Sequence, residues 1–489
     1  MSVETLNIII NYDWIYTIFA AIAVCSTIII IFIILLENRN PVKSLSWVTV
    51  LLLLPVVGLI LYLFFGRSIK NKRMISRRNR RKLKRSSPRS NVDPRALSLE
   101  SGSIQQIILG RSLAGAQFYP GNTVNVFFNG SDKFRAFKED LQRAQSSINI
   151  QYYIIEDDGI GREIADILID KARNGVKVRL IYDHVGSLHV PTRFFRRLKE
   201  NGVDAQPFFK VSFPQLGTRI NWRNHRKMCI IDDTVGYIGG MNIADRYIDG
   251  GKKFASWRDT HTRVTGPIVS AMQYSFAIDW NFTGGELIKD LAPRHTAGFG
   301  TLPGKVDGVG IQLLTSGPTS QWSNIALAFN KAIACASRRV YIQTPYFLPT
   351  ESLLKALQAS ALAHIDVRIM IPRRSDSVML TYASASYISE CLRAGIKIYF
   401  YEAGMLHSKT LLIDDELVSI GSTNFDFRSF DYNFEANLFF YSRELNAAML
   451  ETFNNDLKQC TRVLPAKWRH RGLFRRISES LLRLLSPIL

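Results

Sequence analysis

Hydrophobic residues are concentrated in two long runs near the N-terminus. The first run covers residues 14–36 without a charged residue, and the second covers residues 45–65 with only Pro55 and Gly58 interrupting it. A helix of about 20 apolar residues spans the roughly 30 Å hydrocarbon core of a bilayer. The pattern therefore predicts a two-helix transmembrane hairpin within residues 1–66.

Beyond residue 112 the pattern changes to short β-rich segments that alternate with helical ones, and this order occurs twice. The matching β-rich, helical and strand segments are 149–153, 161–174 and 176–182 in the first copy and 341–346, 351–361 and 366–371 in the second. Such alternation indicates a mainly parallel sheet covered by helices. We expect two α/β half-domains, residues 113–290 and 305–464, that form a pseudo-dimer with a shared site at their interface.

Positive charge gathers after the second hydrophobic run. The net charge is +21, and residues 67–89 contain twelve Lys or Arg and no acid, whereas only Arg39 and Lys43 lie between the two runs. The positive-inside rule then places the N-terminus and everything after the second run in the cytoplasm. Residues 67–112 are expected to be a basic juxtamembrane segment and linker, which either adheres to anionic headgroups or serves as a solvated tether.

The C-terminal residues 465–489 form a second basic segment, in which Leu473, Ile477, Leu481 and Leu484 share one helical stripe. This helix either packs on the body as an ordinary surface helix or lies in the membrane interface, and the hydrophobic N-terminus favours the second alternative. Because most positive charge flanks the body, the composition favours a lipid surface over nucleic acid. The five cysteines are widely spaced without a Cys-x-x-Cys pair, which fits a reducing cytoplasm.

A polar motif, His-x-Lys-x-x-x-x-Asp, occurs once in each half. Its residues are His225, Lys227 and Asp232 in the first half and His407, Lys409 and Asp414 in the second, and a Gly-x-x-Asn run follows each copy and ends at Asn242 or Asn424. Paired imidazoles, ammonium groups and amides suit a phosphodiester. One imidazole attacks phosphorus, the other protonates the leaving oxygen, and Lys and Asn hold the phosphate oxygens. No cluster of His, Asp and Glu suggests a required metal ion, so we expect no cofactor.

Strand geometry separates the roles within the motif. Residues 228–231 and 410–413 are apolar and predict buried strands. Side chains two positions apart share a face of a strand, so His and Lys of each motif point together. Asp232 and Asp414 follow the histidine by an odd offset and would face away. We therefore expect these two aspartates to support the site, although the motif includes them, and to begin a hairpin turn.

The doubled motif with its matched tails resembles the paired signature of the phospholipase D superfamily, and the hairpin followed by two such halves resembles bacterial cardiolipin synthases. The residues that carry the second resemblance are Pro41, Trp47, Pro55, Gly58, Tyr62, Phe65 and Gly66, together with 224–227, 239–243 and 257–260. The resemblance implies tandem phospholipase D-like α-β-α half-domains. It also implies the conversion of two phosphatidylglycerols to cardiolipin and glycerol through a phosphohistidine, in the plasma membrane of a bacterium.

The same resemblance implies further roles. An acid after each motif is expected to hold the histidine Nδ1–H, and these acids are Glu435, in the half of His407, and Asp259, in the half of His225. For Asp259, a surface ion pair with Arg258 or Arg263 is the alternative. His225 is expected to be the nucleophile and His407 the general acid and base. Ser422 is expected to bind phosphate with the two asparagines.

One departure from the commonest superfamily motif is Gly240, which stands where the second copy has Ser422. This asymmetry suits halves with different roles. Every motif would also be present in a membrane phospholipase D or a phosphatidylserine synthase, which differ only in the acceptor. A nuclease of the superfamily is disfavoured by the predicted hairpin, and an inactive scaffold by the two intact motifs. The expected partners are anionic phospholipid and the bilayer, without nucleic acid; the sequence does not decide the oligomeric state.

Overall fold

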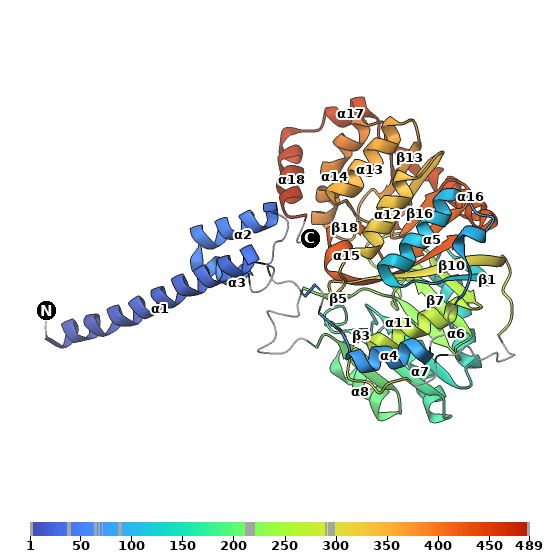
Figure 1. The fold of residues 1–489 in the computed structure, drawn as a ribbon, viewed down its shortest axis with the longest axis horizontal. Helices are drawn as coiled ribbons and strands as arrows, with labels where there is room; N and C mark the ends of the chain where they lie inside the picture. The colour runs from blue at the N-terminus through green and yellow to red at the C-terminus, as the bar shows by residue number, and fades with distance from the viewer. Residues whose placement is uncertain are drawn as a thin grey trace. The chain divides into compact units, whose positions relative to one another are not determined.

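The computed structural model describes residues 3–36, 41–62, 66, 69–70, 72–86, 90–210, 221–288, 291 and 299–486. The chain divides into two units, one containing the N-terminal helices up to Ile69 and the other containing the body from Lys70 onward. Figure 1 shows the elements of both units.

Three helices make up the N-terminal unit: α1 (Val3–Leu36), α2 (Pro41–Leu53) and α3 (Pro55–Leu61). They pack together around Ile34, Leu51 and Tyr62. Among the described residues, only the 23-residue stretch Trp14–Leu36 is long and apolar enough to cross a membrane. This stretch matches the first predicted transmembrane helix.

The second predicted helix, residues 45–65, is not continuous. It is divided at Leu54, where φ is −136°, because Pro55 begins α3. Proline lacks the N–H that would continue the preceding helix, and its ring disfavours helical backbone in the residue before it. The apolar helix before the break, Ser44–Leu53, is too short to span a bilayer, and residues 63–65 lie outside the described residues. A membrane hairpin is therefore not established by the structure.

The body is built on one mixed sheet, in which sixteen strands of the described residues take part. The first half contributes β1 (Phe118–Phe127), β2 (Ser147–Tyr152), β3 (Lys177–Asp183), β4 (Asp204–Phe208), β6 (Met228–Ile231), β7 (Val235–Gly239) and β9 (His261–Thr265). The second half contributes β10 (Val306–Ser316), β11 (Arg339–Gln343), β13 (Asp366–Pro372), β14 (Lys397–Tyr401), β16 (Thr410–Ile413), β17 (Leu417–Gly421), β19 (Asn433–Tyr441) and β20 (Cys460–Arg462). The sixteenth is β5 (Arg223–Asn224), which pairs with β19.

The strand order is symmetric about the antiparallel pair of β1 and β10. Outward from this pair the first half runs β9-β7-β6-β2-β3-β4, and the second runs β19-β17-β16-β11-β13-β14, with β20 added at the edge. The strands expected at 176–182 and 366–371 are β3 and β13, and the buried strands expected at 228–231 and 410–413 are β6 and β16. The predicted duplication of an α/β unit is thus confirmed.

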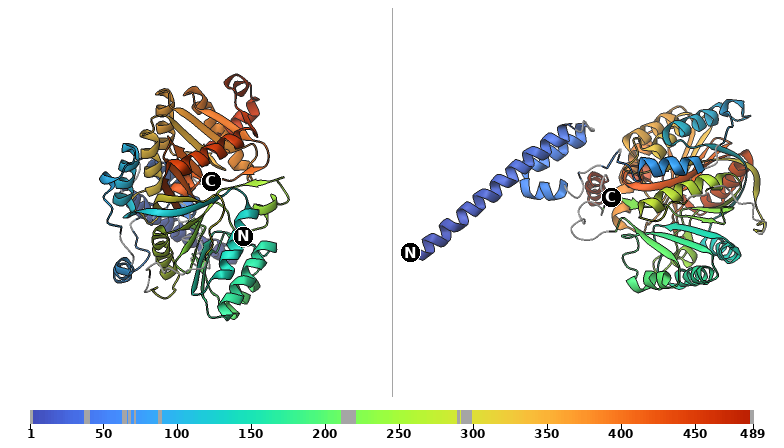
Figure 2. Two further views of the ribbon diagram at one scale, coloured as in Figure 1. Left: turned by 90° about the vertical axis from the view of Figure 1, so that its right-hand side faces the viewer. Right: turned by 60° about the horizontal axis from the view of Figure 1, so that its bottom comes forward.

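Helices cover both faces of the sheet (Figure 2). The helices of the halves are α6 (Gly130–Arg143), α7 (Gly159–Arg173), α8 (Thr192–Glu200), α10 (Arg246–Asp249), α11 (Ile268–Phe282), α12 (Asn324–Ala334), α13 (Glu351–Leu362), α14 (Val378–Arg393), α15 (Phe427–Asp431) and α16 (Arg443–Leu457). On one face a single apolar core runs through both halves beneath α11 and α16. On the other face each half has its own core. The alternation along β6 and β16 places consecutive side chains in different cores.

The segment expected to be a linker contains ordered helices. They are α4 (Arg77–Ser86), a 3-10 turn at Pro94–Ala96 and α5 (Ser101–Ala114). Ile107 of α5 is fully buried in the core of the second half, and Leu83 of α4 is buried in the core shared by both halves. Buried apolar side chains thus hold both helices on the body, in a stretch whose overall polarity favours a loop.

The chain closes with α17 (Pro465–Arg469) and α18 (Leu473–Leu484). Helix α18 lies against α14, where Arg483 donates to Glu390 at 2.5 Å. The predicted apolar stripe of α18 faces away from the body: Leu473 is 70% exposed and Leu484 is 77% exposed. The helix therefore packs through polar contacts and Leu482, while the predicted apolar stripe faces outward.

Candidate active site

A two-residue strand directly precedes each histidine motif and pairs with the opposite half. β5 runs parallel to the start of β19, and β15 (Met405–Leu406) runs parallel to β8 (Trp257–Arg258). The backbone N–H of His225 donates to the carbonyl of Phe434 at 2.9 Å, and that of His407 donates to the carbonyl of Arg258 at 2.7 Å. The start of each motif is thus hydrogen-bonded to the backbone of the other half.

The predicted orienting acids contact the histidines, but in crossed pairs. His225 Nδ1 lies 2.9 Å from Glu435 Oε1, and His407 Nδ1 lies 2.6 Å from Asp259 Oδ2. The sequence places Glu435 in the half of His407 and Asp259 in that of His225, so the structure reverses both pairings. The physical reason is this pairing between the halves, since each acid lies on, or directly after, the strand that pairs with the opposite motif.

Asp259 is not a surface acid. It is fully buried, and the two arginines considered as its partners form ion pairs elsewhere. Arg263 contacts Asp140 at 2.6 Å and Arg258 contacts Asp456 at 2.8 Å. The carboxylate of Asp259 therefore remains available to the imidazole of His407.

The two motifs meet in one site. Lys409 Nζ lies 2.7 Å from Nδ1 and 3.2 Å from Nε2 of His407, and Lys227 Nζ donates to the carbonyl of His225 at 2.6 Å. The charge of Lys409 also acts across the interface, where it lowers the pKa of both His225 and Lys227. Both lysine side chains are buried, and the two half-sites lie close enough for their charges to interact.

Burial controls the protonation of these groups. Loss of solvent, strengthened by the nearby lysines, lowers the pKa of each histidine to about 4, and burial lowers the pKa of Lys409 to about 8. Burial alone would raise the pKa of Asp259 and Glu435, but the facing imidazoles and lysines outweigh it and hold both carboxyls below their usual pKa. Near neutral pH the free site therefore holds two neutral imidazoles against two carboxylates.

The motif aspartates lie away from the imidazoles and hold neighbouring backbone. Asp232 accepts hydrogen bonds from the backbone N–H groups of residues 145–147 and from the Ser146 hydroxyl, at 2.7–2.8 Å. Asp414 accepts the corresponding bonds from residues 337–339 at 2.7–3.2 Å. Both aspartates begin the turn after their strand with positive φ, 49° and 48°. This geometry agrees with a supporting position and fixes the loops that lead into β2 and β11.

The predicted phosphate-binding side chains differ in availability. Asn242 Oδ1 accepts from Ile154 N at 3.1 Å, and its Nδ2 donates to Tyr247 Oη at 2.5 Å, so one amide hydrogen remains. Within the described part of the chain, Asn424 Oδ1 has no hydrogen-bond partner, but this atom is an acceptor. The Asn424 amide NH2 donates to Asp426, so only its second hydrogen remains for a phosphate oxygen. The Ser422 hydroxyl donates to Glu435 Oε2 and accepts from Ala436 N at 3.0 Å. The single hydroxyl hydrogen of Ser422 is bound to Glu435. Ser422 therefore supports the orienting acid, whereas the sequence predicted that it would contact phosphate.

Two buried arginine clusters beneath the histidines did not emerge from the sequence. Arg226 contacts Asp279 at 2.5 Å in one half-site, and Arg258 contacts Asp456 in the other. Each aspartate also accepts from a glutamine: Gln151 donates to Asp279 at 2.6 Å, and Gln343 donates to Asp456 at 2.8 Å. The two glutamines occupy the same place in the repeated segments 149–153 and 341–346, and this shared position was the available signal.

The acids nearest the site, Asp259 and Glu435, are both occupied by an imidazole. Across the parts of the chain that the structure describes, no group of three or more His, Cys, Asp or Glu side chains is arranged to hold a metal ion. The site therefore combines two oriented imidazoles with two buried lysines.

Comparisons with known proteins agree with this arrangement. The family model described as "Cardiolipin synthase, PLD-like domain" matches residues 137–264 and 329–457, and the model "Phospholipase_D-nuclease N-terminal" matches residues 25–67. The major cardiolipin synthase of Bacillus subtilis is 38% identical over 95% of this chain and 98% of its own length. A cardiolipin synthase of Halalkalibacterium halodurans is 37% identical over 97% and 95%, respectively.

Among solved structures, the phosphatidylserine synthase of Haemophilus influenzae is similar with a TM-score of 0.58 at 14% identity. It covers 79% of this chain and all of its own, and it shows the same fold. The two domain matches lie in the two halves, whose histidines are each held by an acid of the other half. The relatives that match nearly the full length extend the similarity to the N-terminal helices. The chain belongs to the cardiolipin synthase family of phospholipase D-like proteins.

Proposed function

We propose that this protein transfers the phosphatidyl group of one phosphatidylglycerol to a hydroxyl of a second, forming cardiolipin and releasing glycerol. The observation that carries the proposal is the crossed site, in which each imidazole is held by a buried carboxylate of the opposite half. The names of the relatives supply the product, cardiolipin, and the family resemblance supplies the donor and acceptor, two anionic lipids that suit a site with two buried lysines.

In the first step His225 Nε2 attacks phosphorus, the P–O bond to glycerol breaks, and His407 gives its proton to the departing oxygen. His407 must carry that proton when the lipid is bound. The negative charge of a phosphodiester raises the pKa of His407 by opposing the nearby Lys409. In the second step His407 removes the proton of the incoming hydroxyl, which attacks phosphorus and breaks the P–N bond. Both imidazoles then return to their starting state.

The remaining site residues stabilise charge and geometry. Lys227, Lys409, Asn242 and Asn424 face the charge that develops on the phosphoryl oxygens, in a site shielded from water. Glu435 and Asp259 fix the imidazoles so that Nε2 is directed to phosphorus. Asp232 and Asp414 act from outside the site, by holding the loops that carry it.

We also propose a membrane arrangement. The span Trp14–Leu36 crosses the bacterial plasma membrane, α2 and α3 return through it, and the basic residues 67–89 keep the body on the cytoplasmic side. The proposed parts are the membrane region 1–66, the juxtamembrane segment 67–112, the halves 113–290 and 305–464, and the C-terminal segment 465–489.

The test is to incubate the full-length protein in detergent with phosphatidylglycerol as the only phospholipid. Cardiolipin and glycerol are expected in equal amounts, and His225→Ala and His407→Ala should each abolish both. A phospholipase D would instead yield phosphatidic acid, and a phosphatidylserine synthase would need serine. Full activity in either histidine variant would rule out the two-histidine mechanism.

A further inference from the structure

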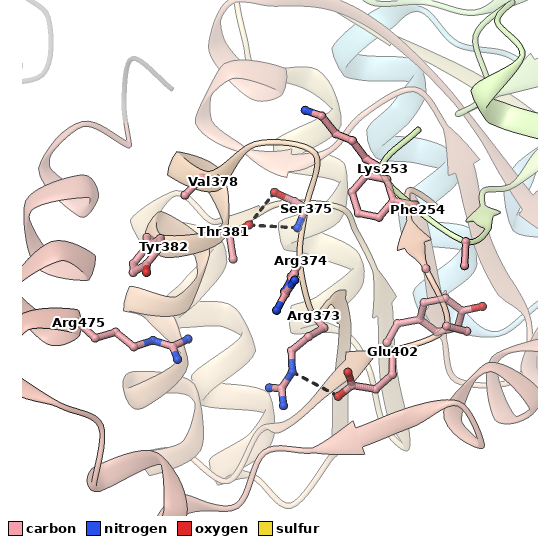
Figure 3. Close-up of a pocket in the computed structure, with 14 residues that line it drawn as sticks. Lys253, Phe254, Arg373, Arg374, Ser375, Val378, Thr381, Tyr382, Glu402 and Arg475 are labelled. Atoms are coloured by element: carbon pink, nitrogen blue, oxygen red, sulfur yellow. Dashed lines mark hydrogen bonds and ion pairs between the residues drawn. The ribbon is translucent and has the colours of Figure 1, made fainter. Parts of the chain in front are cut away.

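A cavity of about 940 Å³ lies in the body near the second histidine motif. Its walls come from three places: Lys253 and Phe254 from the first half, Arg373 and Arg374 from the loop after β13, and Arg475 from α18 (Figure 3). The cavity thus combines parts of both halves and the C-terminal helix.

The charge of this cavity is strongly positive. Four of its lining residues are cationic, and Glu402 is the only acid among them. Glu402 contacts Arg373 at 3.4 Å, and Arg475 contacts Glu479 at 3.0 Å. Within the described part of the chain, Lys253 and Arg374 form no ion pair. Two of the four cations are thus available to an anion.

The cavity adjoins the reacting histidine along the chain. Gly404 lines it and precedes His407 by three residues, so their Cα atoms are at most about 11 Å apart. Asp376, next to the lining residue Ser375, raises the pKa of His407 through its charge. The loop that carries Arg373 and Arg374 therefore lies within electrostatic reach of the site.

Exposed apolar side chains lie at the cavity or next to its lining residues in the chain. Val378, at the start of α14, lines the cavity and is 72% exposed, and the neighbouring Met379 is also exposed. Beside Arg475, the α18 residues Leu473 and Phe474 project their side chains into solvent, with Phe474 85% exposed. A basic cavity next to exposed apolar side chains fits a ligand that carries both a phosphate and hydrocarbon chains.

We propose that this cavity binds the phosphate of the acceptor lipid, with Lys253 and Arg374 as its principal contacts, while the donor phosphate occupies the histidine site. The inference rests on the proposed transfer between two phosphatidylglycerols. That reaction needs two anion sites joined by a single glycerol bridge, because the acceptor hydroxyl and the acceptor phosphate belong to the same headgroup. The cavity is the candidate for the second site because Gly404 in its wall lies three residues before His407, which deprotonates that hydroxyl.

The test compares two acceptors in one reaction. Full-length protein is incubated with detergent micelles of phosphatidylglycerol and with ethanol, a neutral acceptor that has no phosphate. Lys253→Gln combined with Arg374→Gln is expected to lower the ratio of cardiolipin to phosphatidylethanol about tenfold or more, the size of a lost charge-assisted contact. The matched control, Lys355→Gln with Arg393→Gln, removes the same charge from exposed positions outside the cavity and should keep the wild-type ratio.

The outcomes are distinct. An unchanged ratio in the double variant, or a parallel loss of both products in the double and in each single variant, would overturn the acceptor site. An equal fall of the ratio in the control would show that overall charge, not the cavity, governs acceptor binding, and would also overturn it. Failure of the proposed function has its own signature, since wild-type protein would then make phosphatidylethanol without cardiolipin.

Discussion

Substitution of a motif aspartate tests most directly whether the aspartates support the structure while the histidines carry out the chemistry. Removing Asp232 should destabilise the body, because its carboxylate accepts four hydrogen bonds at 2.7–2.8 Å from residues 145–147 and lies 0% exposed. Removing His225 should abolish catalysis without a comparable loss of stability.

The size of the stability loss follows from the hydrogen bonds that each substitution removes. In Asp232→Asn the Oδ1 position can keep its three bonds, but the amide NH2 faces the N–H of Gln145. One unsatisfied donor costs about 1–3 kcal/mol. In Asp232→Ala all four bonds are lost, and a φ of 49° adds about 1 kcal/mol of strain for alanine. Because Gln145 is exposed, water can accept a hydrogen bond from its N–H and offset part of this loss. We therefore expect the free energy of unfolding to fall by about 3–5 kcal/mol in the alanine variant.

Thermal unfolding of the purified variants measures these differences. At about 2 °C per kcal/mol for a large domain, Tm should fall by about 6–10 °C for Asp232→Ala and by about 2–6 °C for Asp232→Asn. His225→Ala is the control with intact Tm and no product. If Asp232→Ala abolished product formation with an unchanged Tm, the supporting role would be refuted, and the carboxylate would have to take part in the chemistry.

Further predictions concern the crossed site. Glu435→Gln keeps the shape but weakens the hold on Nδ1 of His225, and single-turnover assays should show a rate about 10²–10⁴-fold lower, with a shifted pH profile; an unaltered profile would contradict its positioning role. Gly240→Ser would place a Cβ against Oδ1 of Asp259, whereas Ser422→Gly only removes a hydroxyl from Glu435. The activity of Gly240→Ser should therefore fall below that of Ser422→Gly. Equal rates would show that the steric clash at Gly240 does not limit activity.

Tm should drop as the pH is lowered from 6.5 to 4. In this range the imidazoles of the unfolded chain take up protons, whereas the two buried imidazoles, with a pKa of about 4, stay neutral. Replacement of both motif histidines by glutamine should flatten this slope, and a slope that persists unchanged would assign it to other groups.

Much of the site could be predicted because it depends on local geometry. The two-residue period of a strand predicts that His and Lys share a face and that the aspartate turns away, and β6 and β16 have the predicted bounds. The repeat of the motif predicts one shared site. These features depend on a few neighbouring residues, so the sequence alone contains them.

The crossed pairing depends on contacts that local patterns do not encode. Glu435 meets His225 only because β5, far away in the chain, lies beside β19. The cluster of Arg226 and Asp279 has the same origin, since its partners approach from different elements of the fold. The break at Leu54 was signalled by the following proline, yet hydropathy over the whole segment outweighed it in the prediction.

The crossed acids also bear on synthesis of the chain. Domains fold from the N-terminus as they leave the ribosome, so the first half is complete long before residue 435 is made. During that interval His225 has no carboxylate to orient it and no second imidazole to protonate a leaving group. A partly translated chain next to the membrane therefore cannot cleave the phospholipids around it, and activity begins only when nearly the whole protein has been made.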